Sequence, residues 1–158
     1  MGLNKYIVRF GPLVISNLFS KIQDYDTSFI DGLNKPSLYP PGALIGIIWT
    51  VLYYNMGVAL EQIYFNYRES TERTEALFLF IIQFILNLAW SPIFFKNKKF
   101  KTAFIVIVLL ILTVILTFNS FTKIDPSTKS LLTPYLVWLF IAAYINKYLL
   151  DNNPKYNS

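Results

Sequence analysis

Four long apolar stretches constrain this chain more than any other feature of its sequence. They cover residues 44–63, 76–95, 102–121 and 131–150. Each has about 20 residues, which is the length that an α-helix needs to cross a hydrocarbon core of roughly 30 Å. Lipid cannot hydrogen-bond to exposed backbone groups, so stretches of this kind fold as helices. The sequence therefore predicts an all-α membrane protein.

A fifth, shorter stretch at residues 6–22 is predicted to complete a bundle of five transmembrane helices. It is interrupted by Arg9, Pro12, Ser16 and Asn17. Hydropathy alone therefore does not decide whether this stretch is a transmembrane helix. The alternative is a secretory signal. The interruptions fall in what would be the apolar core of such a signal, which favours a retained helix. We expect residues 1–158 to form a single transmembrane domain.

The composition excludes several classes of function. Hydrophobic residues make up 54% of the chain and charged residues 15%, and there is no Cys and no His. A disulfide, a thiolate nucleophile and the usual zinc or haem ligands are therefore impossible, and no metal site or obligatory cofactor is expected. No classical catalytic residues are found, so an enzymatic activity stays an open question. The net charge of +5 comes from basic residues between apolar stretches, which orient a bundle in the lipid bilayer and do not indicate a nucleic-acid partner.

The connection at residues 21–41 is the long one and is predicted to act as a lid. Loops of this length without structure of their own are often lids or binding segments. Its end carries Pro36, Pro40 and Pro41, which force an extended approach to the next helix or serve only to start it. A cluster of four lysines at 96–101 lies on the same predicted side, which places the loop and the C-terminus in the cytoplasm. The Lys- and Asn-rich composition favours a bacterial plasma membrane.

Three of the stretches place aromatic and polar side chains on one helical face. With helical spacing, these faces consist of Trp49, Tyr53, Met56 and Leu60; of Gln83, Asn87, Trp90 and Ser91; and of Tyr135, Trp138, Ala142 and Asn146. Polar groups at this depth are costly unless they face the interior of the bundle. They could simply form hydrogen bonds between helices. The alternative that we pursue is a shared aromatic pocket with few polar anchors, which is typical of small-molecule sites.

Two further features are local. Pro92 removes the hydrogen-bond partner of the Leu88 carbonyl, so the helix is predicted to bend or open beside Trp90. Gly42 and Gly46 are spaced as a contact patch for close helix packing.

Three blocks of sequence resemble a known family. They are KPSLYPPGALIGIIWTVLYYNMGVAL at 35–60, LNLAWSPIFF at 86–95 and PYLVWLFIAAYIN at 134–146. Together with the five stretches and their spacing, these blocks are similar to those of the translocator protein, peripheral-type benzodiazepine receptor or tryptophan-rich sensory protein (TspO/MBR) family. The resemblance covers essentially the whole chain. It departs from the family pattern at Leu38, Val106 and Lys147, where a Trp, an acidic residue and a Tyr are usual.

The resemblance implies a five-helix bundle, commonly a homodimer, whose cavity lies under the first loop. Such cavities bind porphyrins and haem-like tetrapyrroles, sterols and benzodiazepine-type ligands. By resemblance and helical spacing, the ligand-binding residues would be Pro40, Pro41, Trp49, Tyr53, Asn87, Trp90, Ser91, Trp138 and Ala142.

Three hypotheses on function follow. The first is a transporter or stress sensor that binds porphyrins or another hydrophobic small molecule. The second is light- and oxygen-dependent porphyrin degradation in the same cavity, for which Trp49 and Trp138 are the candidate catalytic residues. The third is a scaffold or small-solute exporter that uses Gly42 and Gly46 for assembly.

Overall fold

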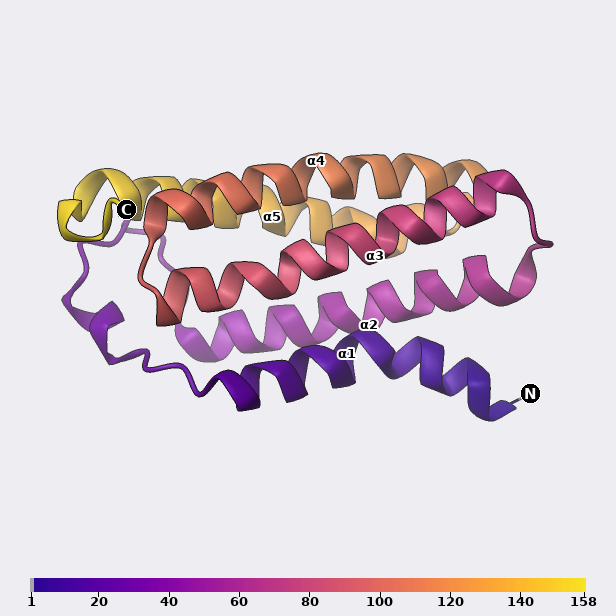
Figure 1. Cartoon of the computed structure of the whole chain (residues 1–158), viewed down its shortest axis with the longest axis horizontal. Coiled ribbons are helices and arrows are strands. Elements are labelled where there is room, and N and C mark those ends of the chain that lie inside the picture. The colour runs from indigo at the N-terminus through magenta and orange to yellow at the C-terminus, as the bar shows by residue number, and fades with distance from the viewer. Residues whose placement is uncertain (1) are drawn as a thin grey trace.

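Five α-helices make up most of the computed structural model, which describes residues 2–158. They are α1 (Gly2–Gln23), α2 (Gly42–Asn66), α3 (Thr71–Ser91), α4 (Phe100–Ile124) and α5 (Thr128–Asn152). The helices run alternately in opposite directions along one axis (Figure 1). No strand occurs within residues 2–158, so the predicted all-α fold is confirmed.

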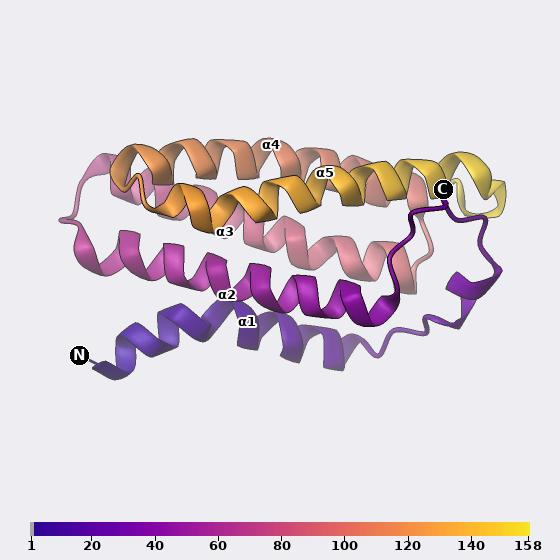
Figure 2. The same cartoon turned by 180° about the vertical axis from the view of Figure 1, so that it is seen from behind.

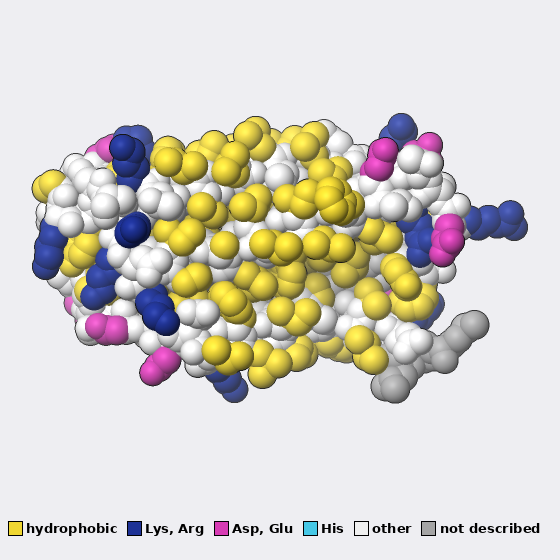
Figure 3. Space-filling model, in the orientation of Figure 1, with side chains coloured by type: hydrophobic (Ala, Val, Ile, Leu, Met, Phe, Trp, Pro, Cys, Tyr) yellow, Lys and Arg dark blue, Asp and Glu magenta, His cyan; other side chains and the backbone are white. Residues whose placement is uncertain are grey.

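Four of these helices are long and apolar enough to cross a membrane. They are α2, α3 with its continuation to Lys96, α4 and α5, which correspond to the four stretches that hydropathy predicted. The same measure does not select α1, so its crossing of the membrane stays a prediction. Figure 3 shows a broad apolar band over the middle of one face, with the charged side chains gathered at the two ends. A surface of this kind fits a bilayer.

The helices extend beyond the apolar stretches because polar residues continue their ends. α3 begins one turn early, where the Ser70 side chain accepts a hydrogen bond from the Arg73 amide at 3.1 Å and caps the helix. α1 continues to Gln23, so the predicted lid loop at 21–41 is shorter than expected and covers residues 24–41. This loop contains a short 3₁₀ helix, η1 (Ser28–Gly32).

The predicted irregularity at Pro92 is present as a π-helical turn. α3 passes directly into η2 (Pro92–Lys96), whose end is closed by a hydrogen bond from the Asn97 amide to the Pro92 carbonyl at 2.9 Å. Proline cannot donate to the preceding turn, and a π turn absorbs that defect without breaking the helix. The π turn places Phe94 in the interior of the protein, beside Trp90.

The two ends of the bundle are packed differently. α3 packs along α4 and α4 along α5, whereas α2 and α3 approach each other much less closely. At the end that holds the α2–α3 and α4–α5 connections, the interior is solid: Met56, Ile63 and Phe121 are fully buried, and Phe80 stacks on Phe121 with 5.9 Å between ring centroids. We call this the closed half. A cavity lies at the other end of the bundle.

α1 is fixed to α2 by one close crossing. A Cβ atom added to Gly57 would lie 1.7 Å from the Arg9 carbonyl oxygen, so only glycine permits this approach. Beside the crossing, the Arg9 guanidinium pairs with the Glu61 carboxylate, and its Nη2 donates to Oε1 at 3.1 Å. Arg9, which interrupted the apolar stretch, therefore has a partner inside the bundle. Gly42 and Gly46 do not form a contact patch within the chain, because a Cβ atom at either meets nothing within 4 Å.

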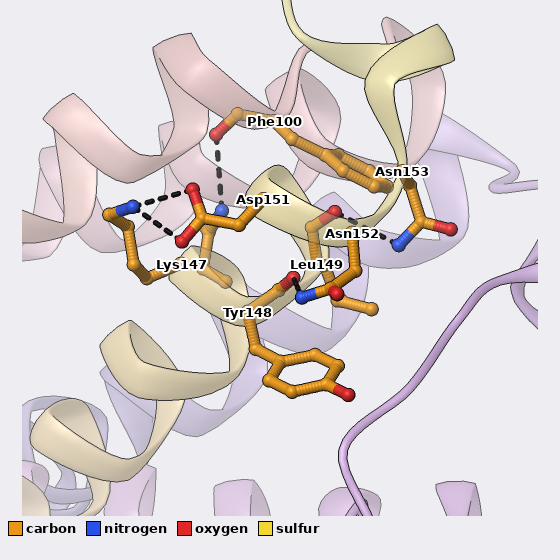
Figure 4. Close-up of polar contacts among 8 residues, drawn as sticks. Phe100, Lys147, Tyr148, Leu149, Asp151, Asn152 and Asn153 are labelled. Atoms are coloured by element: carbon orange, nitrogen blue, oxygen red, sulfur yellow. Dashed lines mark hydrogen bonds and ion pairs between the residues drawn. The ribbon is translucent and has the colours of Figure 1, made fainter.

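The middle of the lid loop is attached to the end of α5. The Asn34 amide donates to the Asn153 side-chain oxygen at 2.9 Å, and the Asn153 side-chain nitrogen donates back to the Asn34 carbonyl at 3.1 Å. The same nitrogen also donates to the Leu149 carbonyl at 2.9 Å (Figure 4). Leu33 is buried next to this pair. Figure 2 shows the loop passing the C-terminus on its way from α1 to α2.

Candidate ligand-binding cavity

A cavity of about 400 Å³ occupies the other end of the bundle, which we call the hollow half. Residues from all five helices line it, together with η2 and the lid loop. The three tryptophans of the chain, Trp49, Trp90 and Trp138, are all among them. The volume falls in the range of about 300 to 1,000 Å³ that is usual for small-molecule sites.

Seven of the nine predicted ligand-binding residues line this cavity: Trp49, Tyr53, Asn87, Trp90, Ser91, Trp138 and Ala142. Pro40 and Pro41 do not line it. Pro41 is the N-cap residue of α2, and the neighbours Tyr39 and Gly42 line the cavity instead. Pro41 thus lies at the helix start that the sequence had left as the alternative, and a role of the two prolines in ligand binding stays a prediction.

Trp49 is the centre of the aromatic wall. Its indole stacks on Tyr53 at 5.3 Å and meets the Trp138 ring edge-on, at 6.5 Å and 88°. Tyr135 meets Trp49 edge-on, at 6.3 Å. Edge-to-face and offset pairs of this kind hold aromatic rings in fixed orientations. The wall therefore presents rigid, flat surfaces to the cavity.

A continuous chain of hydrogen bonds across three helices, which we call the floor, begins at the cavity with Tyr53 and Asn87 and continues below it to Tyr135 and Gln83. The Tyr53 hydroxyl donates to the Asn87 side-chain oxygen at 2.6 Å, and the Asn87 nitrogen donates to the Tyr135 hydroxyl at 2.9 Å. That hydroxyl in turn donates to the Gln83 side-chain oxygen at 2.7 Å. Every member is buried or half-buried and has a partner, so the chain ties α2, α3 and α5 together. Interhelical hydrogen bonds, the alternative left open by the sequence, are thus present at Gln83 and Asn87.

A second pair of hydrogen bonds holds Trp90 in place. Its indole Nε1 donates to the Asn146 side-chain oxygen at 3.0 Å, and the Asn146 nitrogen donates to the Phe100 carbonyl at 3.1 Å. The ring also stacks on Phe94, with 4.7 Å between centroids. Trp90 is therefore positioned by α5 and the start of α4, and its indole N–H already has a hydrogen-bond partner.

One buried donor at the cavity has no partner. Trp138 is only 8% exposed, and its Nε1 makes no hydrogen bond. The Tyr25 hydroxyl is also buried and lies close to the Ser91 side chain. Both residues line the cavity. Burial raises the pKa of the Tyr25 phenol, so this group stays protonated and able to donate at neutral pH. An unpaired donor such as Trp138 Nε1 is rare in folded proteins.

Several lining residues were missed by the sequence reasoning. The lid loop contributes Tyr25, Thr27 and Tyr39, and α1 contributes Ser16, Asn17, Phe19 and Ser20. The loop residues carry no periodic signal. The polar residues of α1 lie at i, i+1 and i+4 within an apolar stretch, and that spacing could have indicated an inward-facing stripe.

The chemistry open to the cavity is limited. None of its lining residues is charged, and within residues 2–158 no three His, Cys, Asp or Glu side chains are grouped so that they could hold a metal ion. The site offers no acid–base pair. It can bind a flat, apolar molecule through aromatic contacts and a few hydrogen bonds.

The sequence has clear relatives. The pattern of the TspO/MBR family matches residues 9–150. The chain is 37% identical to a tryptophan-rich protein TspO of Chlorobaculum tepidum over 122 residues, which is 77% of each chain. It is 30% identical to the protein of that name from Bacillus cereus over 141 residues, 89% of each chain. It is 33% identical to the translocator protein of Homo sapiens over 116 residues, 73% of this chain and 69% of that protein.

Proposed function

Because the chain belongs to the TspO/MBR family and carries an aromatic cavity, we propose that it binds porphyrin-type tetrapyrroles in that cavity and transports or senses them in the membrane. The observation that carries this proposal is the convergence of Trp49, Trp90 and Trp138 on one uncharged cavity. A planar macrocycle gains about 0.5 to 1.5 kcal/mol for each aromatic pair beyond the burial of its area. The resemblance seen in the sequence points to the same ligand class.

The position of the tryptophans allows ligand binding to be measured by their fluorescence. All the tryptophans line the cavity, so intrinsic tryptophan fluorescence reports on this site alone. The purified protein in detergent is titrated with protoporphyrin IX, and saturable quenching is expected. Trp138→Ala and Trp90→Ala should each weaken binding about tenfold or more, which is the loss of roughly 1.4 kcal/mol.

The matched control is Phe78→Ala. Phe78 lies on the outer face of α3 with 63% of its surface exposed, and its removal should leave the affinity unchanged. Equal affinities in all variants would contradict the assignment of the pocket. An absence of saturable quenching in the unmodified protein would contradict the ligand class.

A second candidate function is supported by the contacts of Trp49. This indole touches Trp138, Tyr53 and Tyr135, so oxidisable rings lie side by side from the wall of the cavity to the floor. A bound porphyrin that absorbs light can reduce dioxygen, and these rings would stabilise the radicals that result. The chemistry would be that of the ligand, since the site has no acid–base pair.

Illumination of the porphyrin complex in air distinguishes the two candidates. Degradation in the cavity predicts one defined ring-opened product, which is lost in Trp138→Phe although the affinity is retained. Unspecific bleaching at the same rate in both proteins would leave binding as the function. The products are resolved by chromatography and mass spectrometry.

A further inference from the structure

The contact between α1 and α2 changes along its length. In the closed half, the two backbones touch at Gly57 and Arg9. Moving along the same face of α2 toward the lid, the residues are Thr50, Gly46 and Gly42, and the facing stripe of α1 carries Ser16, Asn17 and Ser20. All six line the cavity. We call this set the seam.

The seam does not close. A Cβ atom at Gly46 or Gly42 would meet no atom within 4 Å, whereas one at Gly57 would collide with the backbone of α1. Six residues both line the cavity and are exposed on the outer surface, and five of them are the seam residues Asn17, Ser20, Gly42, Gly46 and Thr50; the sixth is Thr27 in the lid loop. The cavity therefore reaches the outside mainly between α1 and α2.

This opening lies within the apolar band of the surface. The seam is flanked by side chains that are about half exposed or more and belong to lipid-facing positions: Val14, Ile15 and Leu18 of α1, and Ile47 and Val51 of α2. Figures 1 and 2 show α1 on the outer side of the bundle, alongside α2. The seam thus opens toward hydrocarbon.

Three of the four polar residues of the seam hydrogen-bond to the backbone of their own helix. Ser16 and Asn17 donate to the Leu13 carbonyl of their own helix at 3.0 and 2.7 Å, and Thr50 donates to the Gly46 carbonyl at 2.9 Å. A small polar side chain that hydrogen-bonds to its own backbone has a partner for its donor even in lipid. Behind the seam, Trp138 lines the cavity, and its buried Nε1 has no hydrogen-bond partner within the chain.

From these observations we infer that the tetrapyrrole enters the cavity sideways from the bilayer, through the seam between α1 and α2. The crossing at Gly57, reinforced by the pair of Arg9 and Glu61, is the fixed point from which α1 swings. The lid loop, attached through Asn34 and Asn153, stays closed during entry. This inference rests on the proposed function.

The test follows the rate of binding to protein in liposomes. The probe is protoporphyrin IX dimethyl ester, which is uncharged and dissolves in the bilayer, and stopped-flow tryptophan quenching gives the association and dissociation rates. Gly46→Phe fills the seam where there is open space. A blocked path slows association and dissociation together, each by about tenfold or more. Gly11→Phe is the matched control, because Gly11 also has open space but does not line the cavity, and its rates should equal those of the unmodified protein.

A third variant tests the route through the lid. Asn153→Ala removes the two hydrogen bonds between Asn153 and Asn34 and so loosens the loop, although the Asn34 side-chain nitrogen still donates to the Asn152 carbonyl at 3.0 Å. The association rate should be unchanged. Faster association in Asn153→Ala, or an unchanged association rate in Gly46→Phe, would overturn entry through the seam. In either case, saturable binding would still support the proposed function. A raised Kd at an unchanged association rate would also overturn it, because the added ring would then only occupy ligand space. If the unmodified protein shows no saturable quenching, the proposed function itself fails, and the seam with it.

Discussion

The closed half and the hollow half of the bundle are built from the same helices but packed by different means. In the closed half, aliphatic and phenyl side chains such as Met56, Ile63 and Phe121 fill the space completely. In the hollow half, the walls are indoles and phenols that are held at fixed angles by one another and by hydrogen bonds. Lipid gives apolar side chains no reason to collapse. An open cavity in a membrane bundle therefore needs rigid walls and a solid half beside it, and this chain provides both.

The comparison predicts that the single largest effect comes from Gly57. Gly57→Leu forces a side chain into the backbone of α1, and we expect it to destabilise the protein by at least about 3 kcal/mol or to release α1 from the bundle. Thermal unfolding in detergent, followed by circular dichroism, measures this. Gly46→Leu adds the same side chain where there is open space and should be close to neutral. Equal stabilities would show that the closed half does not depend on the crossing.

The next largest effect separates packing from binding. Phe121→Ala removes a fully buried ring that stacks on Phe80, and should cost about 3 kcal/mol of stability. Its porphyrin affinity should change little. Trp138→Ala removes a ring that lines the cavity, so it should cost most of the affinity. Unfolding and binding are measured on the same samples, and a reversal of this pattern would break the comparison.

The sequence predicted the two halves unequally. The apolar stretches gave the helices, because hydropathy reports directly on length and lipid exposure, and the helical spacing gave the faces of Trp49, Asn87 and Trp138. The spacing could not show which polar groups pair with each other: the chain from Tyr53 to Gln83 depends on the rotation of three helices together. Such rotations are set by contacts far apart in sequence.

The lid and α1 were the least predictable parts. The contributions of Tyr25 and Tyr39 come from a loop without periodicity, and the prolines beside Tyr39 were more conspicuous in the sequence. In the sequence, the charge of Arg9 argues against a membrane helix. The structure shows that this charge is paired with Glu61, 52 residues away. A single charge in an apolar stretch does not reveal its partner.

The polar floor between the halves should show an intermediate effect. Asn87→Leu removes both hydrogen bonds of the amide and leaves the Tyr53 and Tyr135 hydroxyls without these contacts, which should cost about 1 to 3 kcal/mol. Asn17→Leu is the control, because the Asn17 amide bonds only to its own helix. Thermal unfolding of the two variants is compared. If both are equally stable, the floor does not join the halves.

A smaller and more local effect is expected at the lid. Asn153→Ala removes the reciprocal hydrogen bonds with Asn34, worth about 1 kcal/mol in net terms. Hydrogen exchange should accelerate in residues 28–38 and remain unchanged in the closed half. Asn152→Ala is the control, since the Asn152 side chain donates only to the Tyr148 carbonyl of its own helix (Figure 4). Uniformly faster exchange would mean that the lid is coupled to the whole bundle.

The smallest effect compares two similar turns at opposite ends of the molecule. Asp26 in the lid loop and Asp125 between α4 and α5 each accept a hydrogen bond from the amide two residues later, at 2.9 Å. Hydrogen bonds from Ser28 lower the pKa of Asp26, and hydrogen bonds from Ser127 lower that of Asp125.

Because both pKa values are lowered in the folded protein, the stabilisation is complete above the ordinary carboxyl pKa of about 3.9 and is lost as the pH falls through the folded-state values. The turn at Asp125 has further support that does not titrate, since the Thr128 amide and hydroxyl both donate to the Asp125 carbonyl. We therefore expect acidification to lower exchange protection, corrected for intrinsic rates, in the lid loop before it does so in the α4–α5 turn. Asp26→Asn keeps an acceptor oxygen that does not titrate, and should remove the acid dependence of the lid alone. If the lid loop keeps its full protection from exchange at low pH, its attachment at Asn34 alone is enough to hold it. The lid would then belong to the rigid part of the molecule.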